Sequence, residues 1–314
     1  MGDTLTTTTQ VDPAVAVFYD RVLLQAAHPD LVHLKFAQNA RLDKKSGNTY
    51  KWRRYSNLSD ATTPLAEGVN PPGQQMAKTD LTAQVSWYGD FVHITDVVDM
   101  TVEDPVLTIA ADKLGKQMGK TFDTLMRDIL SACASATNAS GGDNSQTPTE
   151  ITRADVDAVV KTLLGADADM VTSMVTASTG VGTTPVRPAF WSIIHTDLLD
   201  DLEAVTGFKS TSEYPRQNDV DDAEWGATGN VRWLLTTNAK KTSESPAQYH
   251  LPIIGQNAYG DVALATVKNI VKAFGSGGTS DPLNRKATSG WKKVWVARIL
   301  NDSFMHVLEV TKDT

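Results

Sequence analysis

The sequence has little cysteine and no long hydrophobic run. Cys133 is the only cysteine, so no disulfide can form within the chain, and a free thiol is most easily kept in a reducing compartment. No segment approaches the roughly 18 to 20 apolar residues that cross a bilayer, and the N-terminus has no basic stretch followed by an apolar one. These absences exclude a disulfide scaffold and predict a chain that is neither secreted nor inserted in a membrane.

Positive charge is also in the minority. The chain carries 29 Lys and Arg against 37 Asp and Glu, which gives a net charge of −8. It therefore lacks the broad basic face through which nucleic-acid-binding proteins release counterions. Any contact with DNA must therefore be confined to a small basic patch of the surface.

The residue patterns of catalytic and metal sites are missing. The six histidines form no i,i+4 pair, and no serine lies in a G-x-S-x-G turn. Two glycine-rich segments, 180–182 and 275–278, lack the third glycine or the lysine with which such loops bind phosphate. Cys133 falls on an apolar helix face, where burial makes a thiol inert. We expect no catalytic residue, no metal site and no cofactor.

Helix and strand patterns are both present, and together they predict an α+β fold. Apolar residues recur at steps of three, four or seven over 107–135, after an Asp-Pro helix-start signal, and predict one long helix. A capping-box pattern at Thr152 and Asp155 predicts a second helix, which ends at Gly165.

The second half of the chain contains several predicted strands. The apolar runs at 190–195 and 231–237 predict buried strands among amphipathic helices, so we expect a mixed α/β part between about 150 and 250. The runs 291–300 and 304–310 flank an Asn-Asp turn and predict a closing hairpin.

The N-terminal third has a different organisation. Residues 1–11 have little to bury, which predicts a loose tail, and 13–29 have the pattern of a short amphipathic helix. Strands are predicted at 49–56 and, from a clear period of two, at 81–91. The connection 57–80 is rich in proline and glycine, and a connection of this length is unusual inside a compact domain. It predicts a hairpin that projects from the body.

The segment 51–55, Lys-Trp-Arg-Arg-Tyr, has two interpretations. Its rings and cations could stack on and neutralise a nucleic-acid strand. They could also form the root of the hairpin, with the arginines paired to acids of a neighbouring subunit. Because the net charge is negative and the run is isolated, we favour the subunit interface.

Four ordered segments carry a family resemblance. They are YDRVLLQAAHPDLVH (19–33), ATTPLAEGVNP (61–71), YGDFVHITDVVDM (88–100) and LNRKATSGWKKVWVARILND (283–302). Together with the arm, the projecting hairpin, the long helix and the α/β part, they resemble the major capsid protein of tailed bacteriophages, the HK97 fold, and in particular its N4-like family. The resemblance extends from about residue 13 to 310.

The resemblance implies a domain organisation. An N-terminal arm would span 1–45 and an extended loop hairpin 46–93. A peripheral domain, which holds the long spine helix, would combine 94–150 with 251–314. An axial domain would span 151–250.

The resemblance also implies a function. Copies of the chain would assemble as hexamers and pentamers into an icosahedral shell that encloses double-stranded DNA without sequence-specific binding. The protein would be located in the virion after assembly in the cytoplasm of the bacterial host. Its partners would be itself, a separate scaffolding protein and a portal, with a decoration protein as a further candidate.

Exposed side chains on the arm helix, the hairpin root and the hairpin tip are candidates for subunit contacts. They are Tyr19, Arg21, Trp52, Arg53, Arg54, Leu65 and Val69. Two other classes stay open. One is a non-viral cage of the same fold that holds cargo, and the other is an α/β enzyme or solute-binding protein, which would need a pocket with convergent polar groups.

Overall fold

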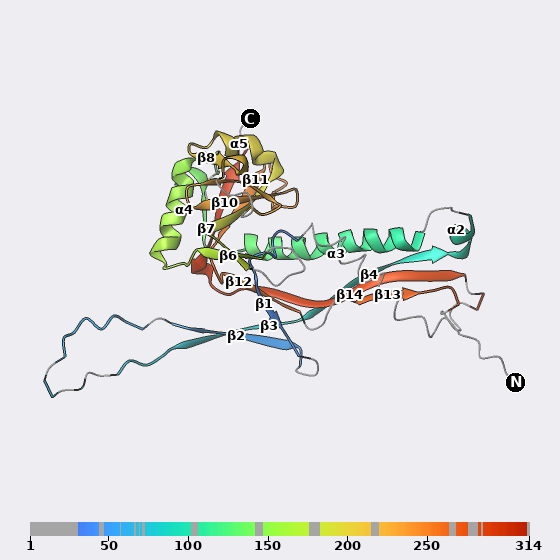
Figure 1. Ribbon diagram of the computed structural model, residues 1–314, viewed down its shortest axis with the longest axis horizontal. Coiled ribbons are helices and arrows are strands. Elements are labelled where there is room, and N and C mark those ends of the chain that lie inside the picture. Colours follow the sequence, from blue (N-terminus) through green and yellow to red (C-terminus); the bar gives the residue numbers. More distant parts are fainter. Residues whose placement is uncertain are drawn as a thin grey trace.

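The chain folds into two β-sheets, a long helix and a hairpin that leaves the body (Figure 1). This computed structural model describes residues 31–43, 47–56, 58–65, 67–68, 70, 73–101, 106–141, 147–175, 183–214, 220–263, 268–275, 282–283 and 285–312. The predicted tail and arm helix, with Tyr19 and Arg21, lie outside the described residues, as does Val69.

The smaller sheet is built around one long strand, β14. This strand pairs antiparallel with β4, β12 and β13, and β12 also pairs in parallel with β1. The five strands are β1 (Gln38–Arg41), β4 (Ser86–Thr95), β12 (Tyr259–Ala263), β13 (Lys268–Lys272) and β14 (Lys286–Ile299). The short helix α2 (Asp96–Thr101) follows β4 directly.

The helix α3 (Val106–Ser131) lies along one face of this sheet (Figure 1). Its 26 residues span about 39 Å at 1.5 Å per residue. The buried side chains recur every four residues, as the sequence pattern requires: Leu114, Met118, Phe122, Met126 and Leu130. The Phe122 ring lies 5.6 Å from that of Trp291 and 5.3 Å from that of Trp295. The long spine helix is therefore confirmed, although it ends slightly before its predicted end.

The larger sheet has eight strands. They are β5 (Ala136–Asn138), β6 (Val171–Val175), β7 (Thr183–His195), β8 (Phe208–Ser210), β9 (Glu224–Thr228), β10 (Val231–Thr236), β11 (Gln248–Ile254) and β15 (Met305–Thr311). The predicted strands at 190–195 and 231–237 are confirmed as parts of β7 and β10, which pair in parallel.

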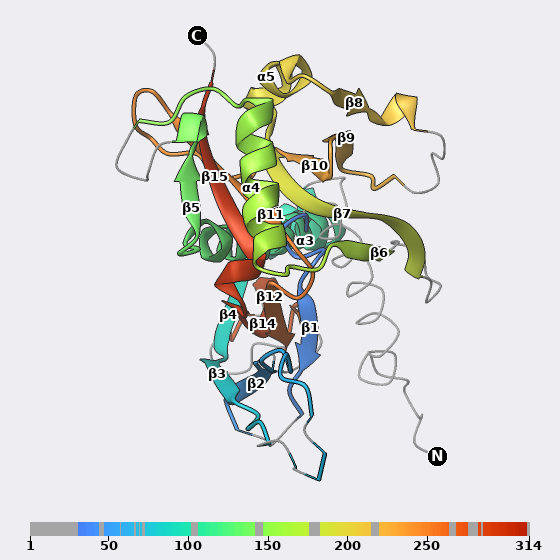
Figure 2. The ribbon, with the colours of Figure 1, turned by 90° about the vertical axis from the view of Figure 1, so that its left-hand side faces the viewer.

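Two α-helices accompany the larger sheet. α4 (Arg153–Gly165) crosses one face of it (Figure 2), and its Val156, Val159 and Leu163 pack on that face. Its capping box is present as predicted. α5 (Leu199–Ala204) follows β7. Short 3-10 turns lie at η3 (Ala139–Gly141), η4 (Thr196–Leu198), η5 (Thr211–Glu213) and η8 (Asp302–Phe304).

The predicted hairpin leaves the body as a separate ribbon (Figures 1 and 2). β2 (Thr49–Tyr55) and β3 (Lys78–Gln84) form a two-stranded antiparallel sheet. Beyond these strands, residues 56–77 form what we call the hairpin loop. Its two sides are joined by a hydrogen bond of 2.8 Å that Gln74 Nε2 donates to the carbonyl of Ser59.

The alternating run 81–91 does not form one strand. The chain leaves β3 at Val85, and β3 pairs with β2 whereas β4 pairs with β14. Val85 is 7% exposed, but Trp87 and Phe91, two and six residues later on the same alternation, are 65% and 58% exposed. Side chains alternate within β3 and within β4. The change of pairing partner between these two strands depends on tertiary contacts, which the spacing of apolar residues does not reveal.

The predicted closing hairpin is wrong. β14 and β15 are both strands, but β14 pairs in the smaller sheet while β15 pairs with β11 and β5 in the larger one. Between them the η8 turn carries the chain from one sheet to the other. The turn signal between the two apolar runs therefore predicts both strands correctly, but it does not predict which strands they pair with.

The larger sheet contains strands from more than one of the predicted domain ranges. β5 and β15, from the ranges assigned to the peripheral domain, lie in it together with β7 and β10 of the predicted axial domain, and β11 spans the boundary between the two ranges. The domain boundaries stay a prediction. One core cluster contains residues of both sheets, among them Phe122 of α3 and Ile193 of β7. The two sheets thus share buried contacts.

Candidate subunit-contact surfaces

Trp52 fixes the hairpin to the body of its own chain. The side chain is 7% exposed, and the ring of Tyr50 meets it edge-on at 4.9 Å. A Cβ atom at Gly260 would lie 3.2 Å from the indole nitrogen, so the glycine leaves room for the ring. The cluster around Trp52 contains Leu42, Val85, Val262 and Val294. The contact of Trp52 with a neighbouring subunit stays a prediction, and the ring has little free surface for it.

Arg53 and Arg54 are both exposed and lie on opposite faces of the hairpin root. Arg53 Nε donates to Asp80 Oδ1 at 3.3 Å, directly across the hairpin on β3. Slight burial acts to raise the pKa of Asp80, but the hydrogen bond from Arg53 and the charges of two neighbouring lysines outweigh it and hold this pKa below its usual value. Arg54 Nη1 donates to the carbonyl of Leu300 at 3.5 Å. Pairing of these arginines with acids of a neighbouring subunit stays a prediction, since Arg53 has an acidic partner in its own chain.

The hairpin loop is both apolar and acidic. Its exposed apolar side chains are Leu58, Leu65 and Met76, which are 56%, 75% and 64% exposed. Its charged residues are Asp60 and Glu67, and the loop contains no lysine or arginine. Leu65 is thus an uncovered apolar side chain of the hairpin loop, and its contact with a neighbouring subunit stays a prediction.

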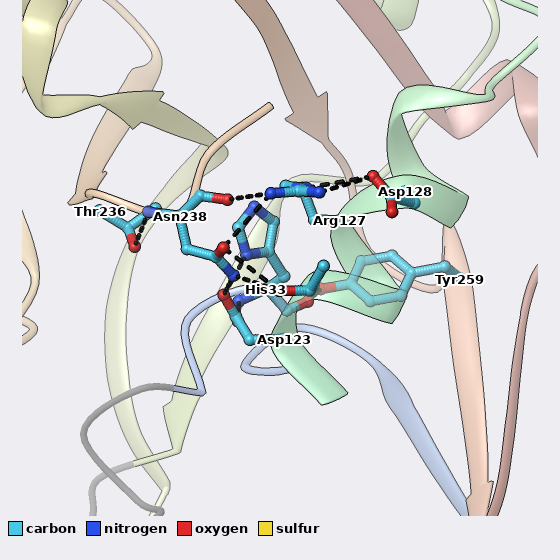
Figure 3. Close-up of polar contacts among 8 residues, drawn as sticks. His33, Asp123, Arg127, Asp128, Thr236, Asn238 and Tyr259 are labelled. Carbon is cyan, nitrogen blue, oxygen red and sulfur yellow. Dashed lines mark hydrogen bonds and ion pairs between the residues drawn. The ribbon is translucent and has the colours of Figure 1, made fainter. Parts of the chain in front are cut away.

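A buried polar network holds residues 31–37 against the rest of the described chain (Figure 3). The backbone N–H of His33 donates to Asp123 Oδ1, and its ring Nδ1 lies against Asp123 Oδ2, both at 2.8 Å. Asn238 Nδ2 donates to the same Oδ2 at 2.8 Å, and the Tyr259 hydroxyl donates to the carbonyl of His33 at 2.7 Å. The side chains of His33 and Asp123 are 1% and 0% exposed. Residues 31–37, α3 and the turn after β10 therefore meet at one carboxylate, and β12 joins the network through the carbonyl of His33.

A second set of contacts continues along α3 from this network. Arg127 Nη1 donates to the carbonyl of Asn238 at 3.3 Å (Figure 3), and Lys240 Nζ donates to Asp128 Oδ1 at 2.9 Å. Partial burial acts to raise the pKa of Asp128, but Lys240 and Arg127 outweigh it, so this pKa is lowered. These contacts hold the C-terminal half of the spine helix against the turn that follows β10.

A lysine and an aspartate lie between α3 and the smaller sheet. Lys293 Nζ lies 4.3 Å from the centre of the Phe122 ring. Trp295 Nε1 donates to Asp261 Oδ2 at 3.3 Å. Burial lowers the pKa of Lys293 and raises that of Asp261, although each charge favours the other. No sequence pattern indicates this pair, because neither residue belongs to a recognised motif.

The face of the smaller sheet opposite α3 is only partly covered. Side chains alternate along β14, so Trp291, Lys293 and Trp295 point to α3 and Lys292 and Val294 point away from it. Val294 is covered by the hairpin root. Further along the sheet, the surface that we call the open face is formed by Trp87, Phe91, His93, Ile270, Lys272 and Lys292. Lys292 Nζ lies 4.4 Å from the centre of the Trp87 ring.

The open face is not among the candidate surfaces that the sequence predicts. Trp87 and Phe91 fall in one alternating run, whose apolar side would normally be buried. One signal was present, because Gly89 lies between them and a glycine inside a strand often marks a close approach or a site of contact. The neighbouring strands of this sheet, β13 and β14, lie far from β4 in sequence. The sequence alone therefore does not place their lysines on the open face.

Two features of the described residues bear on metal binding and on thiol chemistry. In the part of the chain that the structure describes, no group of three or more His, Cys, Asp or Glu side chains is placed to hold a metal ion. Burial raises the pKa of the Cys133 thiol, which disfavours the reactive thiolate. No described helix is both long and apolar enough to span a membrane.

Comparison with solved structures shows the fold. The capsid of Ralstonia phage GP4 has a TM-score of 0.68 at 10% identity, over 89% of this chain and 88% of that one. The capsid of Cyanophage Pam1 has a TM-score of 0.61 at 13% identity, over 92% and 93%. A virus-like particle from Pyrococcus furiosus has a TM-score of 0.51 at 15% identity, over 94% and 99%. The predicted HK97-like α+β fold is therefore confirmed.

A family model agrees with the structural likeness. No curated protein matches the sequence, but residues 78–292 match the model described as phage capsid protein, which covers more than half of the chain. This match supports the predicted function as a major capsid protein, with a structural role in the virion. The chain therefore belongs to the phage capsid protein family.

Proposed function

We propose that copies of this capsid protein assemble as hexamers and pentamers into an icosahedral shell around the double-stranded DNA of a tailed phage. The observation that carries the proposal is the hairpin loop, whose Leu58, Leu65 and Met76 are exposed far from the body. Exposed apolar side chains gathered on one projecting element are typical of interaction sites. Burying them against a neighbouring subunit removes this surface from water.

The assembly is multivalent. Each subunit would offer its hairpin loop and its arm to neighbours and receive theirs, so once a ring has started, each further contact forms at a high effective concentration. Closed rotational symmetry then limits the growth of each ring. Many weak contacts thereby give a stable shell.

The finer assignments are also part of the proposal. The four ordered sequence segments support membership of the N4-like subfamily. We retain the arm, the extended loop, and the peripheral and axial domains, together with a scaffolding protein, a portal and a decoration protein as partners. The net charge of −8 supports a wall that encloses DNA without sequence-specific binding. Assembly would take place in the host cytoplasm.

Deletion of residues 60–76 tests the role of the hairpin loop. We expect a folded chain that fails to form particles, measured by sedimentation and by electron imaging. A matched variant keeps the loop length but replaces Leu58, Leu65 and Met76 by serine, and it should also assemble poorly. Particles of normal yield from both variants would contradict the proposal.

A non-viral cage is a second candidate, because a virus-like particle shares the fold. The contents of purified particles separate the two. DNA inside particles from infected cells supports the capsid, whereas DNA-free particles with a protein cargo would support the cage.

A further inference from the structure

The side of α3 that faces away from the smaller sheet carries a row of exposed lysines. Lys113, Lys116 and Lys120 follow one another at steps of three and four residues, which places them on one side of the helix. All three are exposed, whereas Met118 and Phe122 of the same helix are buried toward the sheet. At 1.5 Å per residue these lysines span about 10 Å, and we call them the lysine row.

The charge of the lysine row is poorly balanced within its own chain. Lys116 Nζ lies 3.5 Å from Asp112 Oδ2, but both side chains are more than a third exposed, so water screens the pair. Among the described residues, no acid forms an ion pair with Lys113 or Lys120. Asp112 is the only acid of α3 before Asp123, and the carboxylate of Asp123 is buried in the network at His33. The row therefore presents positive charge to solvent.

This arrangement works against the stability of the helix. Like charges three or four residues apart repel each other across the surface of a helix. Lys116 has Lys113 on one side and Lys120 on the other at these distances. In a chain whose net charge is −8, three lysines gathered on one helix face indicate a partner of the opposite charge.

The surroundings of the lysine row differ from those of a protein-binding surface. Protein interfaces have apolar and aromatic side chains at their centre, and the open face has such side chains in Trp87 and Phe91. Among the described side chains of α3, only Ile109 is a large apolar residue with more than a third of its surface exposed, and it lies one turn before Lys113. Gln117, beside Lys116, is polar and exposed. Such a surface suits a partner that is bound through its charge.

Double-stranded DNA is the polyanion that the proposed shell encloses. It carries one negative charge per about 1.7 Å of its axis, so a row about 10 Å long lies beside several phosphates. Contacts between lysines and phosphates carry no base sequence information. They therefore agree with a wall that encloses DNA without sequence-specific binding.

The lysine row also lies apart from the hairpin. The hairpin root covers Val294, and Val294 points away from α3 because side chains alternate along β14. The row and the root are thus on opposite sides of the smaller sheet. DNA at the row would not compete with the contacts of the hairpin.

We propose that the lysine row of α3 binds the phosphate backbone of the enclosed DNA. The inference rests on the proposed function and names the surface that meets the genome, which requires this side of α3 to face the interior. One subunit supplies few contacts, and each is weak. The shell repeats them over its whole inner wall, so the DNA is held by many contacts at once.

Titration of a short fluorescent DNA duplex with the unassembled chain at low salt tests the contact. Lys113→Gln, Lys116→Gln and Lys120→Gln together should raise the Kd about tenfold or more. The slope of log K against log salt should fall from about −3 in the unmodified chain toward zero, since each lost phosphate contact removes about 0.9.

A matched control removes three lysines from the opposite side of the sheet. It carries Lys272→Gln, Lys286→Gln and Lys292→Gln, which change the net charge by the same amount. This control should retain the Kd and the salt slope of the unmodified chain. An equal loss of binding in both variants, or no loss in the variant of the lysine row, would overturn the proposal.

Finished particles give a second measurement, which does not depend on the affinity of one chain. Formaldehyde with a borohydride methylates exposed lysine amines, and peptide mass spectrometry measures each position. We expect Lys113, Lys116 and Lys120 to react several-fold less in DNA-filled particles than in particles emptied of DNA, and Lys292 to react equally in both.

Equal reaction of the lysine row in filled and emptied particles would overturn the contact and leave the proposed function standing. Protection in DNA-free precursor particles that is lost when DNA enters would also overturn it, because the partner would then be a protein. If the unmodified chain forms no particles under any condition, the proposed function itself fails.

Discussion

At the scale of single residues, one buried carboxylate ties residues 31–37 to α3 and to the turn after β10. Asp123 accepts hydrogen bonds from three donors on two other segments, the backbone and ring of His33 and the amide of Asn238. A buried carboxylate with satisfied partners specifies one arrangement of these segments, because each alternative arrangement leaves a donor or the charge unpaired.

Asp123→Asn should destabilise the folded chain. The amide offers one acceptor atom where the carboxylate offered two, so a buried donor loses its partner, at a cost of about 1–3 kcal/mol. Urea unfolding of the unassembled chain measures this change. Asp128→Asn, one turn further along the same helix and exposed, is the matched control and should cost less than about 1 kcal/mol. Equal effects of the two substitutions would contradict the role of Asp123.

The stability of the chain should fall as the pH decreases through the histidine range. Burial lowers the pKa of His306 in the folded state below its ordinary value of about 6.5. The unfolded state then binds more protons than the folded state below this value, so stability is fully present above about pH 6.5 and decreases below it.

Urea unfolding at pH 7.5 and 5.5 measures this dependence, and His306→Gln should reduce it because glutamine does not titrate. An unchanged dependence in this variant would show that His306 does not cause it. Burial also lowers the pKa of His195 and His250, so part of the dependence should remain.

At the scale of elements, patterns among residues close in sequence predict several helices and strands correctly. The capping box at Thr152 and Asp155 and the four-residue spacing along α3 each specified a helix correctly, because hydrogen bonds and packing within a helix join residues that are close in sequence. The hairpin was recognisable from its proline and glycine content for the same local reason.

Thr152→Ala should destabilise α4. Thr152 Oγ1 accepts a hydrogen bond from the backbone N–H of Asp155, and the Asp155 carboxylate accepts one from the backbone N–H of Thr152. Loss of this cap costs about 1 kcal/mol. Thr152→Ser keeps the hydroxyl and should retain most of the stability in thermal unfolding followed by circular dichroism. A serine variant as unstable as the alanine variant would point to the methyl group instead of the cap.

Pairing between distant strands was not predictable in the same way. The pattern of 81–91 predicts one strand and that of the C-terminal runs predicts one hairpin, yet in both cases the chain changes from one sheet to another. The open face escaped prediction for this reason. Its aromatic residues come from β4 and its lysines from β13 and β14, and only the register of these strands brings them together.

At the scale of the whole molecule, the two sheets are not independent units. The cluster beneath α3 includes Trp291 and Trp295 of the smaller sheet together with Trp191, Ile193 and Ile254 of the larger one. The network at Asp123 adds polar contacts between the same parts. Movement of one sheet relative to the other would therefore break buried contacts.

The unassembled chain should unfold in a single cooperative transition despite its two sheets. Since they share one apolar cluster, unfolding of either exposes the side chains of the other. Calorimetry checks this, with equal calorimetric and van't Hoff enthalpies as the expected result. Two separated transitions would show that each sheet is stable alone, and Trp191→Leu should then affect only one of them.

The composition of the hairpin loop determines which protease can report on it. Trypsin cleaves after lysine and arginine, which residues 56–77 lack, so the loop resists trypsin whether it is bound or free. Thermolysin, which cleaves beside large apolar residues, finds exposed Leu58, Leu65 and Met76. We expect thermolysin to cleave the loop in free chains and to leave it intact in finished particles. The loss of cleavage during assembly would then show when the loop becomes buried.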